Sequence, residues 1–237
     1  MIRPILRKAC SIRYFSYEAQ YQGRNVYLLP HQHKYTLIWL HGLGGSAFDW
    51  KGFFDIGRTR FVSPENTKVT LLSAPIRPIS IYRDMPKPAW YNIIETEKIL
   101  KESEDDVNDS CKIIAEQIHK EAKLLNSYSK IIVGGFSQGC AMALAVSMKI
   151  DEVLGGVCGY SGLLFRFTRL SEKKKMPIFL YHGSADNVIP IYVAQKSYKR
   201  LIDANYNISF KIEEGVEHDI SDKGFEEGSK FIRNIFC

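Results

Sequence analysis

The sequence predicts an α/β protein in which a mostly parallel sheet is covered by helices on both faces. Short apolar runs rich in Val, Ile and Leu alternate with helical patterns along the chain, which is typical of this class. No linker rich in Pro, Gly or Ser divides the chain, and the longest apolar stretches, about ten residues, are too short to cross a bilayer. We therefore expect residues 18–237 to form a single domain, preceded by a basic segment over residues 1–17.

Six apolar runs predict the strands, because they are short and rich in the residues of buried strands. They cover residues 35–40, 69–75, 130–135, 155–161, 177–183 and 208–215. Helices are expected over residues 104–126, from about Pro190 to Asp203, and from about Ser221 to Ile235. The first helix begins with acidic residues, which complement the helix dipole, and carries one apolar face. Pro190 suits the first position of the second helix.

The composition is that of a globular protein with its own core, since 45% of the 237 residues are hydrophobic and 24% are charged. The five cysteines are odd in number, widely spaced and free of CxxC pairs. They predict reduced thiols in a cytoplasmic protein and not a disulfide framework or a zinc site. The sequence contains no HExxH, no P-loop and no GxGxxG after an early strand, so no metal or other cofactor is expected.

The positive charge is concentrated at the start of the chain. The net charge is +6, and residues 1–17 hold four basic residues and no acid, which leaves +2 for residues 18–237. A nearly neutral body does not indicate nucleic-acid binding. The basic start is compatible either with a mitochondrial presequence over residues 1–16 or with a simple basic tail.

Ser137 stands between Gly135 and Gly139, where the apolar run 130–135 ends and a helix of small and apolar residues begins. A strand, the pattern GxSxG and a helix together are typical of a nucleophile elbow. The turn is so tight that side chains two residues before and after the serine would collide with their neighbours. The serine hydroxyl would stand at the carboxyl end of the sheet, where open α/β sheets bind ligands. Ser137 is therefore the predicted nucleophile.

A serine hydroxyl needs a general base, and two histidines follow Ser137 in the sequence. His182 lies in or at the end of a predicted strand, whereas His218 lies in a loop after the last predicted strand. Because a loop at that position can lean over the serine, His218 is the predicted base. His182 is expected to shape its own loop by local hydrogen bonds.

The acid that orients the imidazole is expected between the serine and the histidine in the sequence. Asp186 follows the strand that precedes the last one, in the loop-forming segment HGSADNVIP. Glu213 and Glu214 lie at the end of the strand that leads to His218, and Asp203 lies near a helix end. Asp186 is the predicted acid, with the other three as alternatives.

An oxyanion hole requires backbone N–H groups near the nucleophile. One donor is expected from Gln138, which follows the serine, and the second from Leu43, in the glycine-rich loop that follows the strand over residues 35–40. His41 is expected to hold this loop by hydrogen bonds and not to take part in catalysis.

Six segments occur in an order that resembles a known family: HGLGG, SAPIRPIS, AWYNI, GGFSQG, HGSADNVIP and EGVEHD. This order, over residues 34–236, resembles the acyl-protein thioesterases and lysophospholipases of the phospholipase/carboxylesterase group. The resemblance implies an α/β-hydrolase fold, the triad Ser137, Asp186 and His218, and oxyanion donors at Leu43 and Gln138. It also implies hydrolysis of acylated proteins or lysophospholipids through an acyl-enzyme, with transient contact to a membrane surface.

Some residues depart from the family pattern. Gly45 stands where the family usually has an acid, Cys140 where it has glycine, Asn92 where it has aspartate, and residues 160–165 lack a tryptophan. The proline-bearing segment 75–90 is expected to be a loop that either forms a wall of an acyl groove or packs on the core. In the first case Ile79, Ile81 and Trp90 would line the groove, together with the run 163–165, and medium or long acyl chains would be preferred over acetyl.

Two other functions are compatible with the sequence. One is a general carboxylesterase that acts on small soluble esters. The other is a binding protein of α/β-hydrolase shape that holds an acyl ligand without cleaving it.

Overall fold

The computed structural model describes residues 16–55, 61–96, 99–170 and 176–236. The predicted basic segment, with its possible targeting role, therefore lies outside the described residues except for Ser16 and Tyr17. Within the described part of the chain, no helix is long and apolar enough to cross a membrane. Cys111, Cys140 and Cys158 are buried free thiols, as predicted, whereas Cys10 and Cys237 lie outside the described residues.

The centre of the molecule is an eight-stranded sheet with the order β1-β2-β4-β3-β9-β10-β11-β12. β2 is antiparallel to both of its neighbours, and every other neighbouring pair is parallel, which confirms the predicted mostly parallel sheet. In sheet order the strands are β1 (Glu18–Gln22), β2 (Asn25–Leu29), β4 (Thr67–Leu72), β3 (Tyr35–Leu40), β9 (Ile131–Phe136), β10 (Gly156–Tyr160), β11 (Ile178–Gly183) and β12 (Ile208–Glu213).

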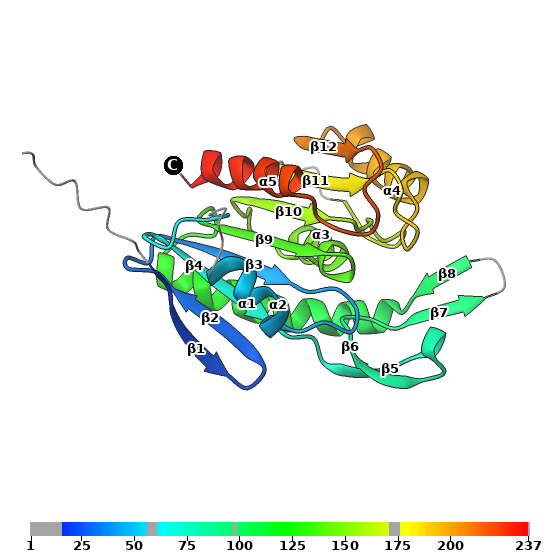
Figure 1. Ribbon diagram of the computed structural model, residues 1–237, viewed down its shortest axis with the longest axis horizontal. Coiled ribbons are helices and arrows are strands. Elements are labelled where there is room, and N and C mark those ends of the chain that lie inside the picture. The colour runs from blue at the N-terminus through cyan, green and yellow to red at the C-terminus, as the bar shows by residue number, and fades with distance from the viewer. Residues whose placement is uncertain (1–15, 56–60, 97–98, 171–175, 237) are drawn as a thin grey trace, which may run out of the picture.

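Five helices of the described chain pack on this sheet (Figure 1). They are α1 (Ala47–Asp55), α2 (Glu104–Leu125), α3 (Gln138–Lys149), α4 (Ile191–Asp203) and α5 (Asp222–Ile235). Pro190, predicted as the first residue of α4, instead caps the helix, which begins at Ile191.

The core lies on both faces of the sheet because side chains alternate along each strand. In β3, Ile38 and Leu40 belong to the cluster that packs against α2, α3 and α4. Leu37 and Trp39 belong to the other cluster, which packs against α1 and α5. The predicted covering of both faces by helices is therefore confirmed.

The predicted loop over residues 75–90 is instead a β-hairpin. It consists of β5 (Ile76–Ile79), a short 3₁₀ turn η1 (Ser80–Tyr82) and β6 (Met85–Pro88), and β7 (Ile93–Thr96) and β8 (Ile99–Glu102) form a second hairpin after it. Both hairpins lie to one side of the central sheet (Figure 1). Proline is rare in central strands but is tolerated in strands that pair on one side only. The prolines of this segment therefore suggested a loop although the segment forms a hairpin.

Of the two alternatives for this segment, a groove wall or packing on the core, the second holds for most of the proposed lining residues. The side chains of Ile79 and Trp90 are fully buried, and of the three proposed lining residues only Ile81 is partly exposed. Trp90 packs in the core, where its indole N–H donates a 2.8 Å hydrogen bond to the carbonyl oxygen of His41. Leu164 and Phe165 are likewise buried, whereas Leu163 is partly exposed.

Candidate active site

Ser137 occupies the sharp turn between β9 and α3. Its backbone angles are φ 56° and ψ −119°, in a region that L-residues rarely adopt. A Cβ atom on Gly135 would lie 2.6 Å from the carbonyl oxygen of Leu40, and a Cβ on Gly139 would overlap the same oxygen. The two glycines are therefore required for β9 and α3 to approach β3 this closely, as the sequence pattern predicted.

The structure brings Ser137, His218 and Asp186 together at the carboxyl edge of the sheet. They follow β9, β12 and β11, and because these strands are parallel, their ends meet at the same edge. The His218 Nε2 atom lies 2.9 Å from Ser137 Oγ, and Nδ1 lies 2.7 Å from Asp186 Oδ2. The three side chains thus form a continuous hydrogen-bonded chain.

Asp186 is held in place by its own loop. It is 5% exposed, and its Oδ1 atom accepts hydrogen bonds from the backbone N–H groups of Val188 (2.9 Å) and Ile189 (2.8 Å). The other carboxylate oxygen, Oδ2, therefore remains directed at His218 Nδ1. This fixes the imidazole as the tautomer that carries its proton on Nδ1 and leaves Nε2 to accept one from Ser137.

Two of the three alternative acids, Glu213 and Asp203, pair with other residues, and the third, Glu214, is exposed. Glu213 accepts hydrogen bonds from the hydroxyls of Tyr181 (2.9 Å) and Ser221 (2.8 Å). Asp203 pairs with Lys199 on the exposed side of α4, at 2.6 Å.

His182 supports the Asp186 loop, in keeping with its predicted role. Its Nε2 atom lies 2.7 Å from the carbonyl oxygen of Ile189 and 3.2 Å from Asp186 Oδ2. Burial lowers the pKa of His182 below its usual value, so the ring is neutral and its contact with Asp186 is not an ion pair. The neutral ring donates from Nε2 to the Ile189 carbonyl and thereby fixes the loop that presents Asp186.

The glycine-rich loop after β3 lies directly against Ser137. A Cβ on Gly42 would lie 3.2 Å from Ser137 Cβ, so the backbone passes the serine closely. His41 holds this loop, as predicted: Nε2 accepts from the N–H of Ala74 (2.9 Å), and Nδ1 donates to the Gly42 carbonyl (2.6 Å). Gly44 N–H in turn donates to the Pro88 carbonyl at 2.8 Å, which fastens the loop to β6.

Only the backbone N–H of Gln138 was predicted to contribute to the site, but its side chain also organises it. Its amide oxygen accepts from Trp90 N–H (3.0 Å), and its amide nitrogen donates to the Tyr91 carbonyl (2.9 Å). Because Gln138 is the first residue of α3, its own N–H belongs to the first turn, where the helix supplies no acceptor. A glutamine directly after the serine was the only sequence signal for this link.

A cavity of about 290 Å³ lies beside His218. Residues from α1, from the end of β9 and from the loop after β12 line it, namely Asp49, Trp50, Phe53, Phe136, Asp219 and Ile220. The Phe136 ring contacts the His218 ring, with centroids 4.9 Å apart. This cavity therefore adjoins the triad.

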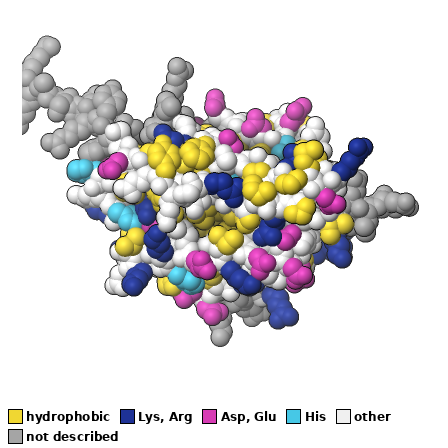
Figure 2. All heavy atoms as spheres, turned by 90° about the horizontal axis from the view of Figure 1, so that it is seen from below, with side chains coloured by type: hydrophobic (Ala, Val, Ile, Leu, Met, Phe, Trp, Pro, Cys, Tyr) yellow, Lys and Arg dark blue, Asp and Glu magenta, His cyan; other side chains and the backbone are white. Residues whose placement is uncertain are grey.

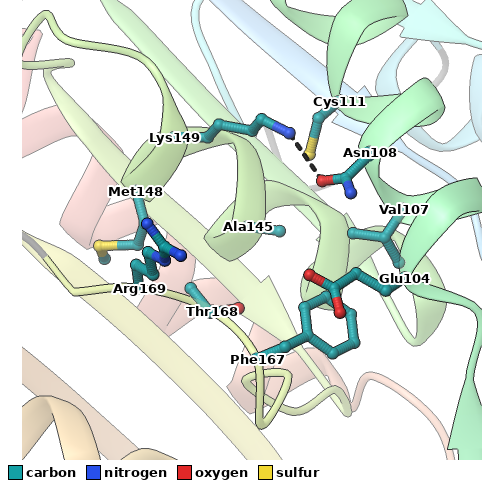
Figure 3. A pocket seen from close by; sticks show the side chains of 10 residues that line it. All are labelled: Glu104, Val107, Asn108, Cys111, Ala145, Met148, Lys149, Phe167, Thr168 and Arg169. Carbon is teal, nitrogen blue, oxygen red and sulfur yellow. Dashed lines mark hydrogen bonds between the residues drawn. The ribbon is translucent and has the colours of Figure 1, made fainter.

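A larger hollow, of about 460 Å³, lies at the other end of α3 (Figure 3). Its walls come from the start of α2, the last turns of α3 and residues 167–169. Ser137 lies at the opposite end of α3, so this hollow is separate from the triad. Cys111 lines it, but burial raises the pKa of this thiol to about 11, so the cysteine is not an activated nucleophile. In the described chain, no group of three or more His, Cys, Asp or Glu residues is placed to hold a metal ion.

The phospholipase/carboxylesterase family model matches residues 25–236. The chain belongs to this family. It is 30% identical to acyl-protein thioesterase 1 of Schizosaccharomyces pombe, over 86% of this chain and 92% of the relative. It is 31% identical to acyl-protein thioesterase 1 of Yarrowia lipolytica, over 84% of this chain and 90% of the relative. The predicted family resemblance is therefore confirmed, and the chain is a serine hydrolase.

Solved structures show the same fold. Acyl-protein thioesterase 2 of Zea mays superposes with a TM-score of 0.78 at 23% identity, covering 91% of this chain and all of that one. SOBER1 of Arabidopsis thaliana superposes with a TM-score of 0.77 at 25% identity, covering 86% of this chain and 99% of that one. The predicted α/β-hydrolase fold is confirmed.

Proposed function

We propose that the protein hydrolyses acyl thioesters and esters through an acyl-enzyme formed on Ser137. The observation that carries this proposal is the hydrogen-bonded chain from Ser137 Oγ through His218 to Asp186, with distances of 2.9 and 2.7 Å. In the first step, His218 Nε2 takes the hydroxyl proton while Oγ attacks the acyl carbonyl carbon. The tetrahedral intermediate then expels the leaving thiol or alcohol, which receives the proton from Nε2.

Water completes the cycle by the same route in reverse. His218 takes a proton from a water molecule, which attacks the acyl carbon, and the fatty acid leaves as Ser137 regains its proton. Asp186 stabilises the charged imidazolium that forms in both halves of the reaction. Its two hydrogen bonds from Val188 and Ile189 N–H hold it in position for this role.

Backbone N–H groups of Leu43 and Gln138 are the proposed donors to the oxyanion. Two features support them: the close approach of the Gly42 backbone to Ser137, and the position of Gln138 in the first turn of α3. Preorganised donors of this kind are worth about 10² to 10³ in kcat each.

Acylated proteins are the proposed substrates. The curated relatives named above are acyl-protein thioesterases and are matched over most of their length, which supports this class. Lysophospholipids are the second candidate, because they present the same acyl carbonyl. A general carboxylesterase is the third, and it is favoured by the burial of Ile79 and Trp90, which removes most of the predicted acyl-groove wall.

Transient contact with a membrane surface is also proposed, through the β5–β6 hairpin. Ile76, Tyr82 and Met85 are exposed there, at 55%, 46% and 57%, and Arg83 and Lys87 supply positive charge beside them. Figure 2 views the molecule from below with respect to Figure 1, where this hairpin lies, and hydrophobic side chains are interspersed on that face with charged side chains of both signs. Apolar side chains among cations suit an anionic lipid surface.

The decisive experiment is the variant Ser137→Ala, tested with a fluorophosphonate probe and with acyl substrates. Wild-type protein should be labelled and the variant should not, and kcat should fall by up to about 10⁶. The fold should survive, because the change removes one hydroxyl. A variant that keeps more than a few per cent of the activity would contradict the assignment, and a wild-type protein that resists the probe would support the non-catalytic binding function instead.

A set of substrates separates the three substrate classes. We expect an octanoylated cysteine peptide to be cleaved with a higher kcat/KM than octanoyl lysophospholipid or acetyl and octanoyl esters of small alcohols. Equal rates on acetyl and octanoyl esters, below micelle formation, would favour the general carboxylesterase.

A further inference from the structure

The cavity beside His218 has walls of a distinct kind. Three aromatic rings, those of Trp50, Phe53 and Phe136, line it together with two carboxylates, Asp49 and Asp219, and no residue that lines it is cationic. Both carboxylates are exposed to solvent, at the mouth of an otherwise aromatic hollow.

The aromatic wall is held rigidly. Trp50 packs against Phe53, Phe136 and the buried Trp39, with ring centroids 5.1, 6.1 and 5.0 Å apart. The rings therefore keep their places whether or not the cavity is filled. The faces of aromatic rings attract cations, and carboxylates at the rim add to that attraction.

The position of the cavity indicates which part of a substrate it receives. His218 must deliver a proton to the leaving group, so the leaving group stands next to the imidazole when the acyl-enzyme forms. The cavity lies beside the same ring, because Phe136, which lines the cavity, contacts the His218 ring. Asp219 and Ile220, which also line it, directly follow His218 in the chain. Its volume of about 290 Å³ suits one headgroup or one side chain and not a long acyl chain.

We propose that this cavity binds an organic cation carried by the leaving group of the substrate. The proposal rests on the proposed function, because it extends the same active site to the far side of the scissile bond. The cation has two chemical sources: the quaternary ammonium of a choline headgroup, or a lysine or arginine beside the acylated cysteine of a protein.

The test compares two octanoyl thioesters that differ only in charge. One has thiocholine as its leaving group, and the other has the neutral isostere 3,3-dimethylbutane-1-thiol. For wild-type protein, we expect kcat/KM to be about tenfold higher for the cationic substrate. In the double variant Asp49→Asn/Asp219→Asn the ratio should fall to about twofold or less.

The two substitutions keep shape and local hydrogen bonds. Asp49 accepts from Ser46 N–H (2.7 Å) and Asp219 from Ile220 N–H (2.7 Å), and the amide oxygen of asparagine can accept in the same places. The matched control is Glu217→Gln, which removes one negative charge directly before His218 from a residue that does not line the cavity. We expect this control to keep the wild-type ratio.

Binding to the Ser137→Ala protein, measured by calorimetry, gives a readout without turnover. This protein should bind the thiocholine thioester about tenfold more tightly than the neutral one, and the preference should fall to about twofold or less when Asp49→Asn/Asp219→Asn is added, because only the aromatic rings then attract the cation. If wild-type protein hydrolyses neither substrate, the proposed function fails, and the calorimetric comparison still decides the cavity.

Three results would overturn the proposal: equal rates and equal binding for the two thioesters, a preference that survives the double variant, or a preference that Glu217→Gln abolishes equally. A second pair of substrates then identifies the source of the cation. Octanoylated cysteine peptides with lysine or norleucine as the next residue test the protein side chain, and a preference for one cation alone assigns the cavity to that source.

Discussion

Cys140 fills a space that two glycines leave open behind Ser137. The thiol is fully buried, and a Cβ on Gly162 would lie 2.5 Å from Cys140 Cβ and 2.6 Å from Sγ. A Cβ on Gly159 would overlap the sulfur itself. Burial raises the pKa of this thiol to about 12, so Cys140 acts as a small apolar residue and not as a second nucleophile. The departure from the family's glycine is thus accommodated by the surrounding backbone.

We predict that Gly159→Ala destabilises the protein by about 1–3 kcal/mol, since it overpacks the core, and that Cys140→Ala relieves much of this cost. Without the sulfur, the new Cβ would lie 3.5 Å from the Cβ of residue 140, an ordinary contact, and 3.0 Å from Leu180 Cδ2, the end of a side chain that must shift slightly. Urea unfolding of the two single variants and the double variant measures the coupling.

Gly162→Ala provides the contrast. Its Cβ would meet Cys140 Cβ at 2.5 Å, so Cys140→Ala should not rescue it. Strictly additive effects for Gly159→Ala and Cys140→Ala would contradict the packing argument.

At the scale of elements, α2 is joined to the sheet by a buried charge. Glu121 on α2 is 0% exposed, and its carboxylate accepts from Lys68 on β4 (2.6 Å) and from Thr36 on β3 (3.1 Å). Gln117, one turn earlier on α2, donates at 2.6 Å. A buried carboxylate must be paired, because its desolvation is costly, so this cluster fixes how α2 lies on the β3–β4 end of the sheet.

We predict that Lys68→Met costs about 3–5 kcal/mol of the free energy of unfolding, because it leaves Glu121 buried without its cation. The double variant Lys68→Met/Glu121→Leu should be far less destabilised, since both charges are gone. Denaturant unfolding followed by circular dichroism measures both.

The control for this prediction is Lys199→Met, which breaks the exposed pair with Asp203 on α4 and should cost at most about 1 kcal/mol. A double variant as unstable as Lys68→Met alone would show that the cost arises from lost packing and not from the unpaired charge.

For the whole molecule, buried neutral histidines couple stability to pH. Burial lowers the pKa of both His41 and His182. His41 Nε2 accepts a hydrogen bond from Ala74 N–H. Protonation of that nitrogen would therefore break the bond and leave two N–H groups facing each other. His182 Nδ1 is buried without a hydrogen-bond partner, so a proton there would be unsatisfied. The folded protein therefore disfavours the charged form of both rings.

The sign of the pH effect follows from linkage. Below the unfolded pKa of about 6.5, the unfolded chain binds protons at these histidines and the folded chain does not. Their contribution to the free energy of unfolding is therefore fully present above that pH and is lost as the pH falls. We predict that the free energy of unfolding decreases from pH 7 to pH 5.

The variant His182→Gln tests the source of this decrease. Its amide nitrogen can still donate to the Ile189 carbonyl, but the side chain does not titrate in this range. The decrease between pH 7 and pH 5 should be smaller than in wild-type protein, whatever the stability at pH 7. An unchanged slope would remove His182 as a cause.

Local patterns in the sequence predicted the six parallel strands, the helices α2, α3, α4 and α5, and the tight turn at Ser137. These follow from local rules: apolar runs of strand length, helical periodicity, and the need for glycine at positions 135 and 139. The order of serine, acid and histidine also identified Ser137, Asp186 and His218 as candidates. The structure brings these three within hydrogen-bonding distance, and their catalytic roles remain a prediction.

Which apolar side chains belong to the core and which surround the site depends on contacts that form only in the folded chain. Trp90 could have lined a groove or packed in the core by its sequence alone, and its burial depends on His41 and Gln138, each nearly 50 residues away in the sequence. The strands β1 and β2, the helix α1 and the two hairpins also escaped prediction, because they are short, half exposed or rich in proline. The cavity beside His218 combines α1, β9 and the loop after β12. Contacts between segments so far apart depend on the order of the strands in the sheet and on the register in which neighbouring strands pair. No local pattern of residues specifies either of these.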